Sequence, residues 1–412
     1  MHFQSPLQFK SLKVPKIFQS LSYPNFRNYF IGHTLSTLGT WIQQVALAWL
    51  VYDLTKSAAL LGMIAFFAMA PQLVLSPFVG AVIDKVNKRL ALIFVQGLLL
   101  FQSILLAYLS HSNLLNSTNI ISISLLLGIF TAIDTPLRQS FISDLVDNKN
   151  DIANALALNA MIFNSCRFIG PPIAGFLLAI SNAFTCFIFN AFSYLFLIIA
   201  LALMKNVNIS KATGNIKNVL KEGYLFIFKN KEYSRMMLNV AFLNLTASSY
   251  VAILPIFAKD HLKGNETTLG YLWGMAGIGS LLSSLILANT QNFERIQQRI
   301  FINMSLCAIA LFMLGLINVQ LSYYLAMLIL GFGISTANVS TNILIQRNTP
   351  ALLRGRIVAI YTSIRFGFDA VGGLIAGLLA TWLGAKITMF NFGCILAVYL
   401  VIFSYSKKSS NA

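Results

Sequence analysis

Long apolar stretches recur along almost the whole chain, and short polar segments separate each one from the next. A helix needs about 20 apolar residues to cross the hydrocarbon layer of a membrane. Twelve stretches reach this length and predict twelve transmembrane helices. Only a short stretch around Gly384 separates the last two. The twelve stretches cover residues 29–51, 58–82, 90–110, 119–142, 154–179, 183–204, 234–258, 267–289, 299–318, 321–345, 357–383 and 386–405.

The amino-acid composition supports a membrane protein. The chain is 57% hydrophobic and 10% charged, with a mean hydropathy of +0.74. Soluble domains are about 45–50% apolar and about 25% charged. Water cannot solvate a surface of this composition, so the lipid bilayer is the expected solvent. The cysteines Cys166, Cys186, Cys307 and Cys394 lack paired spacing, and residues 1–29 do not resemble a cleaved signal peptide.

Basic residues are distributed unevenly between the predicted loops. With the N-terminus placed in the cytoplasm, the inner segments hold 22 Lys and Arg residues and the outer loops hold four. Cytoplasmic loops carry such an excess. Both termini are therefore expected in the cytoplasm, and topology accounts for most of the net charge of +17 without a nucleic-acid partner.

Two sets of six predicted helices flank a basic linker. We divide the chain into an N-terminal six-helix bundle (1–204), a cytoplasmic linker (205–233) and a C-terminal six-helix bundle (234–412). Apolar residues at helical spacing in the linker predict an amphipathic helix on the inner membrane surface. The segment around Gly175 in the fifth helix resembles the segment around Gly377 in the eleventh. Two repeated six-helix halves are typical of secondary transporters.

Charge is concentrated in the predicted cytoplasmic loop between the second and third helices. The pattern there is Gly80-x-x-x-Asp84-Lys85-x-x-Lys88-Arg89. A glycine permits close approach of another backbone, and a carboxylate at an opposing helix N-terminus is stabilised by ~0.3–1 kcal/mol. Such a contact, made in one conformation and broken in another, can bias a two-state equilibrium. An arbitrary basic turn is the alternative reading of this cytoplasmic gate motif.

This loop resembles the signature that the major facilitator superfamily carries at the same place. The resemblance implies an all-α membrane protein with two pseudo-symmetric six-helix bundles that works by alternating access. Residues 25–32, 41–55 and 134–139 further resemble the branch of bacterial enterobactin-type siderophore exporters and macrolide efflux proteins. The loop at 288–299 lacks the Gly-x-x-x-Asp pattern, so a cytoplasmic gate is expected mainly in the first half.

A second motif lies in the fifth helix. Gly170, Pro171, Pro172 and Gly175, with Arg167 before them, resemble the Gly-Pro motif of antiporters in the same superfamily. Proline removes a backbone hydrogen bond within a transmembrane helix, and glycine permits close packing of a neighbouring helix. Small-residue packing without a functional role is the alternative.

Five charged residues lie within predicted spans: Asp134, Arg138, Arg167, Arg365 and Asp369. Such charges are costly in a membrane and mark functional candidates with a partner. Asp134 and Arg138, like Arg365 and Asp369, are four residues apart and share a helix face. An acid whose surroundings change with conformation can bind and release a proton, so these five are the proton-coupling candidates. Permanent ion pairs are the alternative for both carboxylates, and Arg167 is more readily explained as a structural partner.

Polar residues at helical spacing mark a candidate substrate path. In this superfamily the first helix of each triplet lines the central cavity, and the polar positions fall on those helices. A single stripe can also reflect hydrogen bonding between helices. His33 is either a proton relay or a packing histidine, and Trp41, Trp49 and Trp273 either stack on a substrate or anchor the interface. The candidates are His33, Thr37, Thr40, Gln44, Thr131, Asn244, Ser248, Ser335, Asn338 and Asn342.

Other classes of protein are poorly supported. The sequence has no phosphate-binding Gly-x-x-x-x-Gly-Lys-Ser/Thr loop, and its four histidines lack metal-ligand spacing, so no enzyme activity, metal or cofactor is expected. We expect a monomeric, proton-coupled exporter in a bacterial inner membrane, with an amphipathic siderophore or hydrophobic drug as its small-molecule substrate. A lysolipid flippase, an importer of nutrients or siderophores, and a non-transporting membrane sensor are the alternatives.

Overall fold

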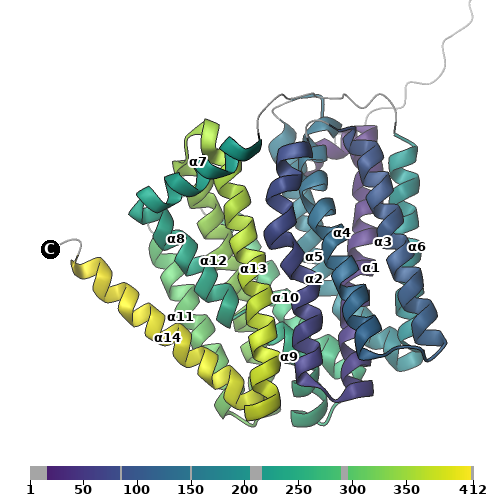
Figure 1. Ribbon diagram of the computed structural model, residues 1–412, viewed down its shortest axis with the longest axis vertical. Coiled ribbons are helices and arrows are strands. Elements are labelled where there is room, and N and C mark those ends of the chain that lie inside the picture. The colour runs from purple at the N-terminus through teal and green to yellow at the C-terminus, as the bar shows by residue number, and fades with distance from the viewer. Residues whose placement is uncertain (1–15, 84–85, 149–150, 205–215, 289–295, 410–412) are drawn as a thin grey trace, which may run out of the picture.

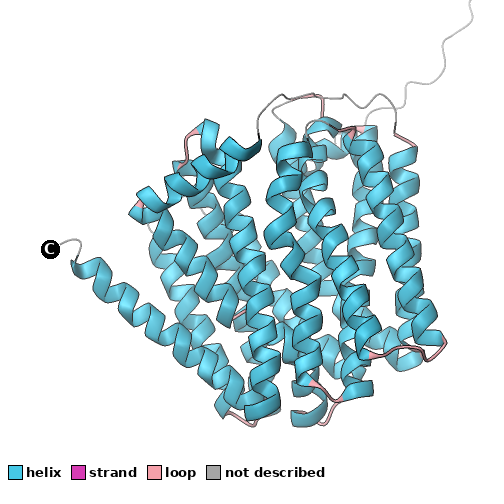
Figure 2. Ribbon diagram, in the orientation of Figure 1, coloured by secondary structure: helices cyan, strands magenta, loops and turns pink. Residues whose placement is uncertain are grey.

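The structure is a computed structural model, and it describes residues 16–83, 86–148, 151–204, 216–288 and 296–409. Within these ranges the chain is almost entirely helical and has no strand (Figure 2). Six long helices form the N-terminal half: α1 (Pro24–Thr55), α2 (Ala58–Val82), α3 (Lys88–His111), α4 (Ser117–Ile142), α5 (Ile152–Ile180) and α6 (Ala183–Ala202). The short helices η1 (Lys16–Ser22) and η3 (Ser143–Leu145) accompany them.

The C-terminal half begins after α7 (Ile216–Lys229). It contains α8 (Lys231–Thr246), α9 (Tyr250–Ile256), the π-helical turn η5 (Phe257–His261), α10 (Glu266–Ala288), α11 (Ile296–Leu316), α12 (Gln320–Asn348), α13 (Ala351–Leu383) and α14 (Ala385–Ser409). Figure 1 shows the two halves side by side, with α2 and α13 adjacent where they meet. The bundle architecture predicted from the sequence is confirmed.

Local sequence signals set several helix starts. Ser57, Asn87, Asn116 and Asn182 precede α2, α3, α4 and α6, and each side chain accepts a hydrogen bond from a backbone N–H three residues later. These N-caps satisfy donors that the first turn leaves unpaired. Gly384 separates α13 from α14 with a positive φ of 82°, a conformation that glycine adopts without strain. The last two spans are therefore separate helices.

Among the described residues, eleven helical segments are long and apolar enough to cross a membrane. α1 has 32 residues, but its polar side chains lower its hydropathy below that of the others. It nevertheless packs along α5 and α6 as a full member of the bundle. Large apolar side chains on the outside, such as Phe94 at 68% and Trp382 at 85% exposed, suit contact with lipid.

The seventh predicted span is not one continuous helix. It is divided into α8, α9 and η5, with a break at residues 247–249. There the Ser249 hydroxyl donates to the Thr246 carbonyl at 2.5 Å, a local hydrogen bond that competes with the helical ladder. The predicted span over 234–258 lies within one segment that is long and apolar enough to cross a membrane, Lys231–His261, and this break divides it.

α7 lies across one end of the bundle, next to the start of α8 and against α13 (Figure 1). Gly223 faces Ile360 on α13 and Ile227 is buried, whereas Phe228 is 77% exposed. The predicted linker helix thus exists and is two-sided. Its location on the inner membrane surface, and the domain boundaries at 204 and 234, stay predictions.

Candidate functional site

Asp134 and Arg138 form a buried ion pair on α4. Arg138 Nε donates to Asp134 Oδ2 at 2.5 Å, and the two side chains are only 8% and 11% exposed. Their spacing of one helical turn brings both side chains to the same face of α4. A charge buried this deeply requires hydrogen-bonding partners beyond its counter-ion.

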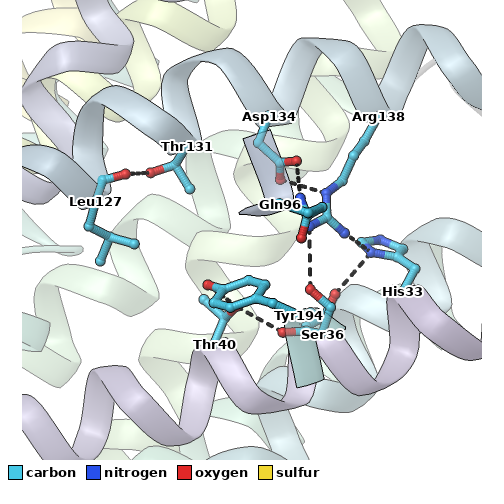
Figure 3. A network of polar contacts seen from close by, with 10 residues as sticks. His33, Ser36, Thr40, Gln96, Leu127, Thr131, Asp134, Arg138 and Tyr194 are labelled. Atoms are coloured by element: carbon cyan, nitrogen blue, oxygen red, sulfur yellow. Dashed lines mark hydrogen bonds and ion pairs between the residues drawn. The ribbon is translucent and has the colours of Figure 1, made fainter. Parts of the chain in front are cut away.

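Neighbouring helices supply those partners (Figure 3). From α3, the buried Gln96 donates its amide to Asp134 Oδ1 at 2.6 Å. From α1, Arg138 reaches His33 Nδ1 through Nη1 and donates to Ser36 Oγ at 3.4 Å through Nη2. Three helices of the N-terminal half therefore meet at this ion pair, which makes the charge of Asp134 sensitive to their relative positions.

Aromatic side chains enclose this network. Tyr29 stacks on His33 with ring centroids 5.1 Å apart, and its buried hydroxyl interacts with Arg138. The Tyr194 hydroxyl shares a hydrogen bond of 3.1 Å with Thr40 (Figure 3). The network thus combines the acid Asp134, the base His33 and the phenol rings of Tyr29 and Tyr194. These groups can exchange protons when solvent reaches them.

The remaining substrate-path candidates of the N-terminal half are placed less uniformly. Thr37 is buried and lies 3.3 Å from His33 Nδ1, whereas Gln44 is partly exposed. Thr131 donates to the Leu127 carbonyl of its own helix (Figure 3). These side chains satisfy one another or their own backbone, as the structural alternative predicts for polar groups in a bundle.

The candidates of the C-terminal half form a separate buried group. Asn244 on α8 donates to Asn338 Oδ1 on α12 at 3.2 Å, and Ser248 donates to Asn244 Oδ1 at 3.2 Å. Ser335 is 8% exposed, while Asn342 is partly exposed and accepts from Gln346. No hydrogen bond in the described part of the chain joins this group to the candidates on α1 and α4. The structure therefore holds two polar groups, one in each half.

A central cluster lies where the halves meet, near the middle of the long helices. It comprises Arg167 on α5, Tyr250 on α9, and Arg365 and Asp369 on α13. Arg365 and Arg167 both act electrostatically on Asp369, but among the described residues no ion pair joins either one to it. The Arg365 guanidinium instead lies 5.2 Å from the ring centroid of Phe366. The second predicted pair is thus not closed in this conformation.

Part of the predicted gate motif lies outside the described residues, namely Asp84 and Lys85. Lys88 Nζ is 2.9 Å from Asp144 Oδ2, and Arg89 donates to the Leu201 and Ala202 carbonyls at the end of α6. A Cβ at Gly80 meets no described atom within 4 Å. In this conformation Lys88 and Arg89 form contacts within the N-terminal half. The expected close approach of another backbone to Gly80 is not made.

The Gly-Pro motif of α5 packs directly on the other half. A Cβ at Gly175 is 2.7 Å from the Glu266 carbonyl and 3.3 Å from Gly270 Cα on α10, and Pro172 contacts Gly274. Gly170 instead packs on Trp41 of its own half, and Pro171 has its carbonyl 2.8 Å from the Cβ position of Gly270. The motif therefore lines a glycine seam, a place where two helix backbones touch across the halves.

A second seam repeats this geometry. A Cβ at Gly377 on α13 is 2.5 Å from the Ala58 carbonyl and 2.7 Å from Gly62 Cα on α2. Ala58 is the first residue of α2, and Glu266 is the first residue of α10. Four residues later in each helix comes the glycine of the seam, Gly62 in α2 and Gly270 in α10. The sequence alignment of Gly175 with Gly377 thus has a structural counterpart, because each lies at an equivalent contact between the halves.

Polar contacts join the halves at the end of the bundle where α1 ends, which the predicted topology places outside. Trp49 Nε1 donates to Glu266 Oε1 at 3.1 Å, and the Tyr52 hydroxyl donates to Asp260. Lys259 forms an ion pair with Asp53. In the described part of the chain these outer contacts close one end of the interface.

Comparison with known proteins identifies the family. The family model described as "Transmembrane secretion effector", of major facilitator type, matches residues 16–410. The chain belongs to this family. It is therefore a multi-pass membrane transporter of small molecules rather than an enzyme.

Several relatives share most of their length with this transporter. The staphyloferrin A transporter of Staphylococcus aureus is 28% identical over 91% of this chain and 95% of its own. The multidrug efflux pump Tap of Mycolicibacterium fortuitum is 22% identical over 88% of this chain and 92% of its own. Macrolide efflux protein A of Streptococcus pyogenes is 18% identical over 88% and 90%. The predicted resemblance to siderophore and macrolide exporters is confirmed at the level of the family.

Solved structures support the same fold. The nucleoside transporter NupG has a TM-score of 0.74 at 13% identity and covers 92% of this chain and 98% of its own. A bacterial homologue of Spinster, in an inward-facing and unoccupied conformation, has a TM-score of 0.72 at 12% identity and covers 93% and 96%. At these identities the likeness shows the fold alone.

Several residues of the polar network were not predicted from the sequence. Gln96, Ser36 and Tyr194 lie on three different helices. Gln96 could have been found because it is a polar residue within an apolar run. A polar side chain buried in a helix bundle requires a hydrogen-bond partner.

Proposed function

We propose that the protein is a proton-coupled exporter, an antiporter that moves an amphipathic small molecule by alternating access. The observation that carries this proposal is the buried Asp134–Arg138 pair, with Gln96 and His33 bonded to it from two other helices. The proton gradient is the energy source, and no cofactor takes part. Relatives named for multidrug and macrolide efflux support export, and a relative named as a staphyloferrin A transporter supports a small-molecule substrate.

The proton step follows from competition within the network. Burial disfavours the carboxylate of Asp134, whereas Arg138 and the Gln96 amide favour it. Tyr29 and Tyr194 also act electrostatically on this pair, so the charged and polar groups around it are contributed by α1, α3, α4 and α6. If α1 or α3 moves relative to α4 when the transporter changes conformation, the balance shifts and Asp134 takes up or releases a proton. Neutralising Asp134 in turn weakens the contacts that hold these helices together, which couples protonation to movement.

The expected setting is the inner membrane of a bacterium, with both termini in the cytoplasm and the protein acting as a monomer. In this orientation the outer contacts at Trp49, Tyr52 and Asp53 face away from the cytoplasm. They join the two halves at the outer end.

The first experiment identifies the substrate. Medium and cell extract from a deletion strain and its complemented parent are compared by untargeted mass spectrometry, in iron-poor and iron-rich growth. Export predicts a compound that disappears from the medium and accumulates in the deletion strain. A compound that accumulates only in the complemented strain indicates uptake and refutes export.

The second experiment tests proton coupling with that compound in proteoliposomes. Asp134→Asn is expected to abolish accumulation driven by an imposed pH gradient, while exchange without a gradient persists. Because removing one partner of a buried pair can unfold a protein, the double variant Asp134→Asn/Arg138→Gln removes both charges together. Asp134→Glu, which keeps an acid, serves as the matched control. Gradient-driven accumulation at the normal level in a folded Asp134→Asn variant refutes the assignment.

A further inference from the structure

One side of α7 is fixed to the C-terminal half. A Cβ at Gly223 lies 2.9 Å from Ile360 Cδ1 on α13, and Ile227, four residues after Gly223, is buried. The ring of Phe226 meets the ring of Tyr233 on α8 edge to face, with the centroids 5.0 Å apart. α7 is therefore seated on the bundle through this side, and the opposite side points away from these contacts.

The opposite side of α7 exposes three large apolar side chains and a lysine. Tyr224 is 42% exposed, Leu225 is 46% exposed and Phe228 is 77% exposed. Lys229, the last residue of the helix, is exposed beside them. We call these four residues the α7 surface. Apolar side chains that are exposed next to one another and bordered by polar residues mark a contact with a protein or a membrane.

The α7 helix also carries an excess of positive charge. It contains three lysines, Lys217, Lys221 and Lys229, and a single acid, Glu222, so two positive charges are in excess. Positions 217 and 221 precede Phe228 by about three and two helical turns, and the helical register places them on the same side. Aromatic residues interleaved with lysines on one side are typical of helices that lie in the headgroup layer of a membrane.

The position of α7 places its surface at the membrane boundary. In Figure 1, α7 runs across one end of the bundle to the edge of the C-terminal half, where α8 begins. Only Asn230 separates α7 from the segment Lys231–His261, which is long and apolar enough to cross a membrane. Phe228 therefore lies three residues before a membrane span, at the depth that the lipid headgroups occupy.

We propose that the α7 surface binds the headgroups of anionic phospholipids in the leaflet at this end of the bundle. The lysines meet the negative charge of the headgroups, while Tyr224 and Phe228 lie at the boundary between headgroups and acyl chains. An anionic lipid complements the apolar side chains and the excess positive charge together, whereas a soluble acidic partner complements the charge alone. This binding requires neither a direction of transport nor the proton step at Asp134.

Fluorescence quenching tests the proposal on the purified full-length protein in lipid nanodiscs. A bimane label is attached to Leu225→Cys after the four native cysteines have been replaced by alanine. The nanodiscs contain phosphatidylcholine and phosphatidylglycerol, and each lipid in turn carries a nitroxide quencher near the top of its acyl chains. A lysine near an anionic surface favours association about fivefold. The association constant from quenching is therefore expected to be at least about fivefold higher for phosphatidylglycerol, and high salt is expected to remove most of this preference.

Charge variants assign the preference to α7. Replacing Lys217, Lys221 and Lys229 together by glutamine is expected to bring the ratio of the two association constants close to one. Replacing the same three by arginine keeps the charge and retains the preference. A label at Leu321→Cys is the matched control, because Leu321 is 64% exposed at the start of α12, at the opposite end of the bundle, and residues 317–320 before it are uncharged. There the two lipids are expected to quench equally.

Equal quenching by the two lipids at Leu225→Cys overturns the proposal, as does a preference for phosphatidylglycerol that survives the three glutamine substitutions. Weak quenching by both lipids means that the α7 surface meets water or another protein, and it overturns the proposal as well. If the glutamine variant does not fold, the salt dependence with native lysines decides, since a preference that persists at high salt is not electrostatic. An antiport mechanism refuted at Asp134 leaves these measurements unaffected, so the two proposals fail separately.

Discussion

Adding one methyl group at Gly377 is expected to push the outer ends of the two halves apart. In Gly377→Ala the new Cβ lies 2.5 Å from the Ala58 carbonyl oxygen and 2.7 Å from Gly62 Cα. Both neighbours are backbone atoms and cannot rotate away. Overpacking of this kind costs about 1–3 kcal/mol, and a conformation that opens the outer end relieves it. The ratio of outward-open to outward-closed protein therefore rises about 5- to 150-fold.

Distances between spin labels measure this ratio. The labels are placed at Leu54 and Tyr271, which are 58% and 60% exposed and lie on α1 and α10. The four native cysteines, which are free thiols, are first replaced by alanine. Gly377→Ala is expected to increase the population at long distance. Gly97→Ala is the matched control, because a Cβ there meets no described atom within 4 Å.

The symmetry of the two seams extends the test. Gly175→Ala places its Cβ 2.7 Å from the Glu266 carbonyl and is expected to act in the same direction. Identical distance distributions in Gly377→Ala and Gly97→Ala, with both proteins monodisperse, refute the reasoning. Identical distributions would mean that the added methyl group is accommodated at the seam without moving the two halves apart.

Three further substitutions probe contacts in the described structure. Asp53→Asn removes the ion pair with Lys259; because Asp53 is 49% exposed, we expect a shift of less than about 1 kcal/mol toward the outward-open state. The spin-label assay detects this shift at low salt, and a larger shift at high salt contradicts the ion-pair explanation. Arg89→Gln removes two hydrogen bonds to the end of α6 and is expected to lower the free energy of unfolding by about 1–3 kcal/mol. An unchanged denaturant midpoint in detergent contradicts that role. Gln96→Leu leaves Asp134 without one donor and is expected to lower the free energy of unfolding by about 1–3 kcal/mol and to change the pH profile of transport. An unchanged pH profile separates Gln96 from the proton step.

Patterns along single helices were predictable from the sequence. An apolar run of about 20 residues and an N-cap such as Asn116 are local signals, and both are set by the backbone's need for hydrogen bonds inside a membrane. The Asp134–Arg138 pair follows from four-residue spacing in the same way. Arg365 and Asp369 have the same spacing but no ion pair in the described structure, because spacing places side chains on a common face and does not select their rotamers.

Contacts between helices were much harder to predict. Nothing near Gln96 in the sequence indicates that it faces Asp134, since they lie 38 residues apart on different helices. Asn244 and Asn338 were expected to line a path, but they satisfy each other across 94 residues of sequence. A helical wheel identifies a polar face and leaves open whether that face meets water, substrate or another helix.

At the glycine seams the two halves touch through backbone atoms, where most interfaces use interlocked side chains. Interlocked side chains have to change rotamers before two surfaces part, and this adds to the barrier. At Gly62–Gly377 and Gly175–Gly270 there are no rotamers to rearrange. These backbone contacts can therefore separate without any change of side-chain rotamer. Under the proposed alternating access, polar contacts at the outer end, such as the Asp53–Lys259 ion pair, are then the ones that must break before the halves part there.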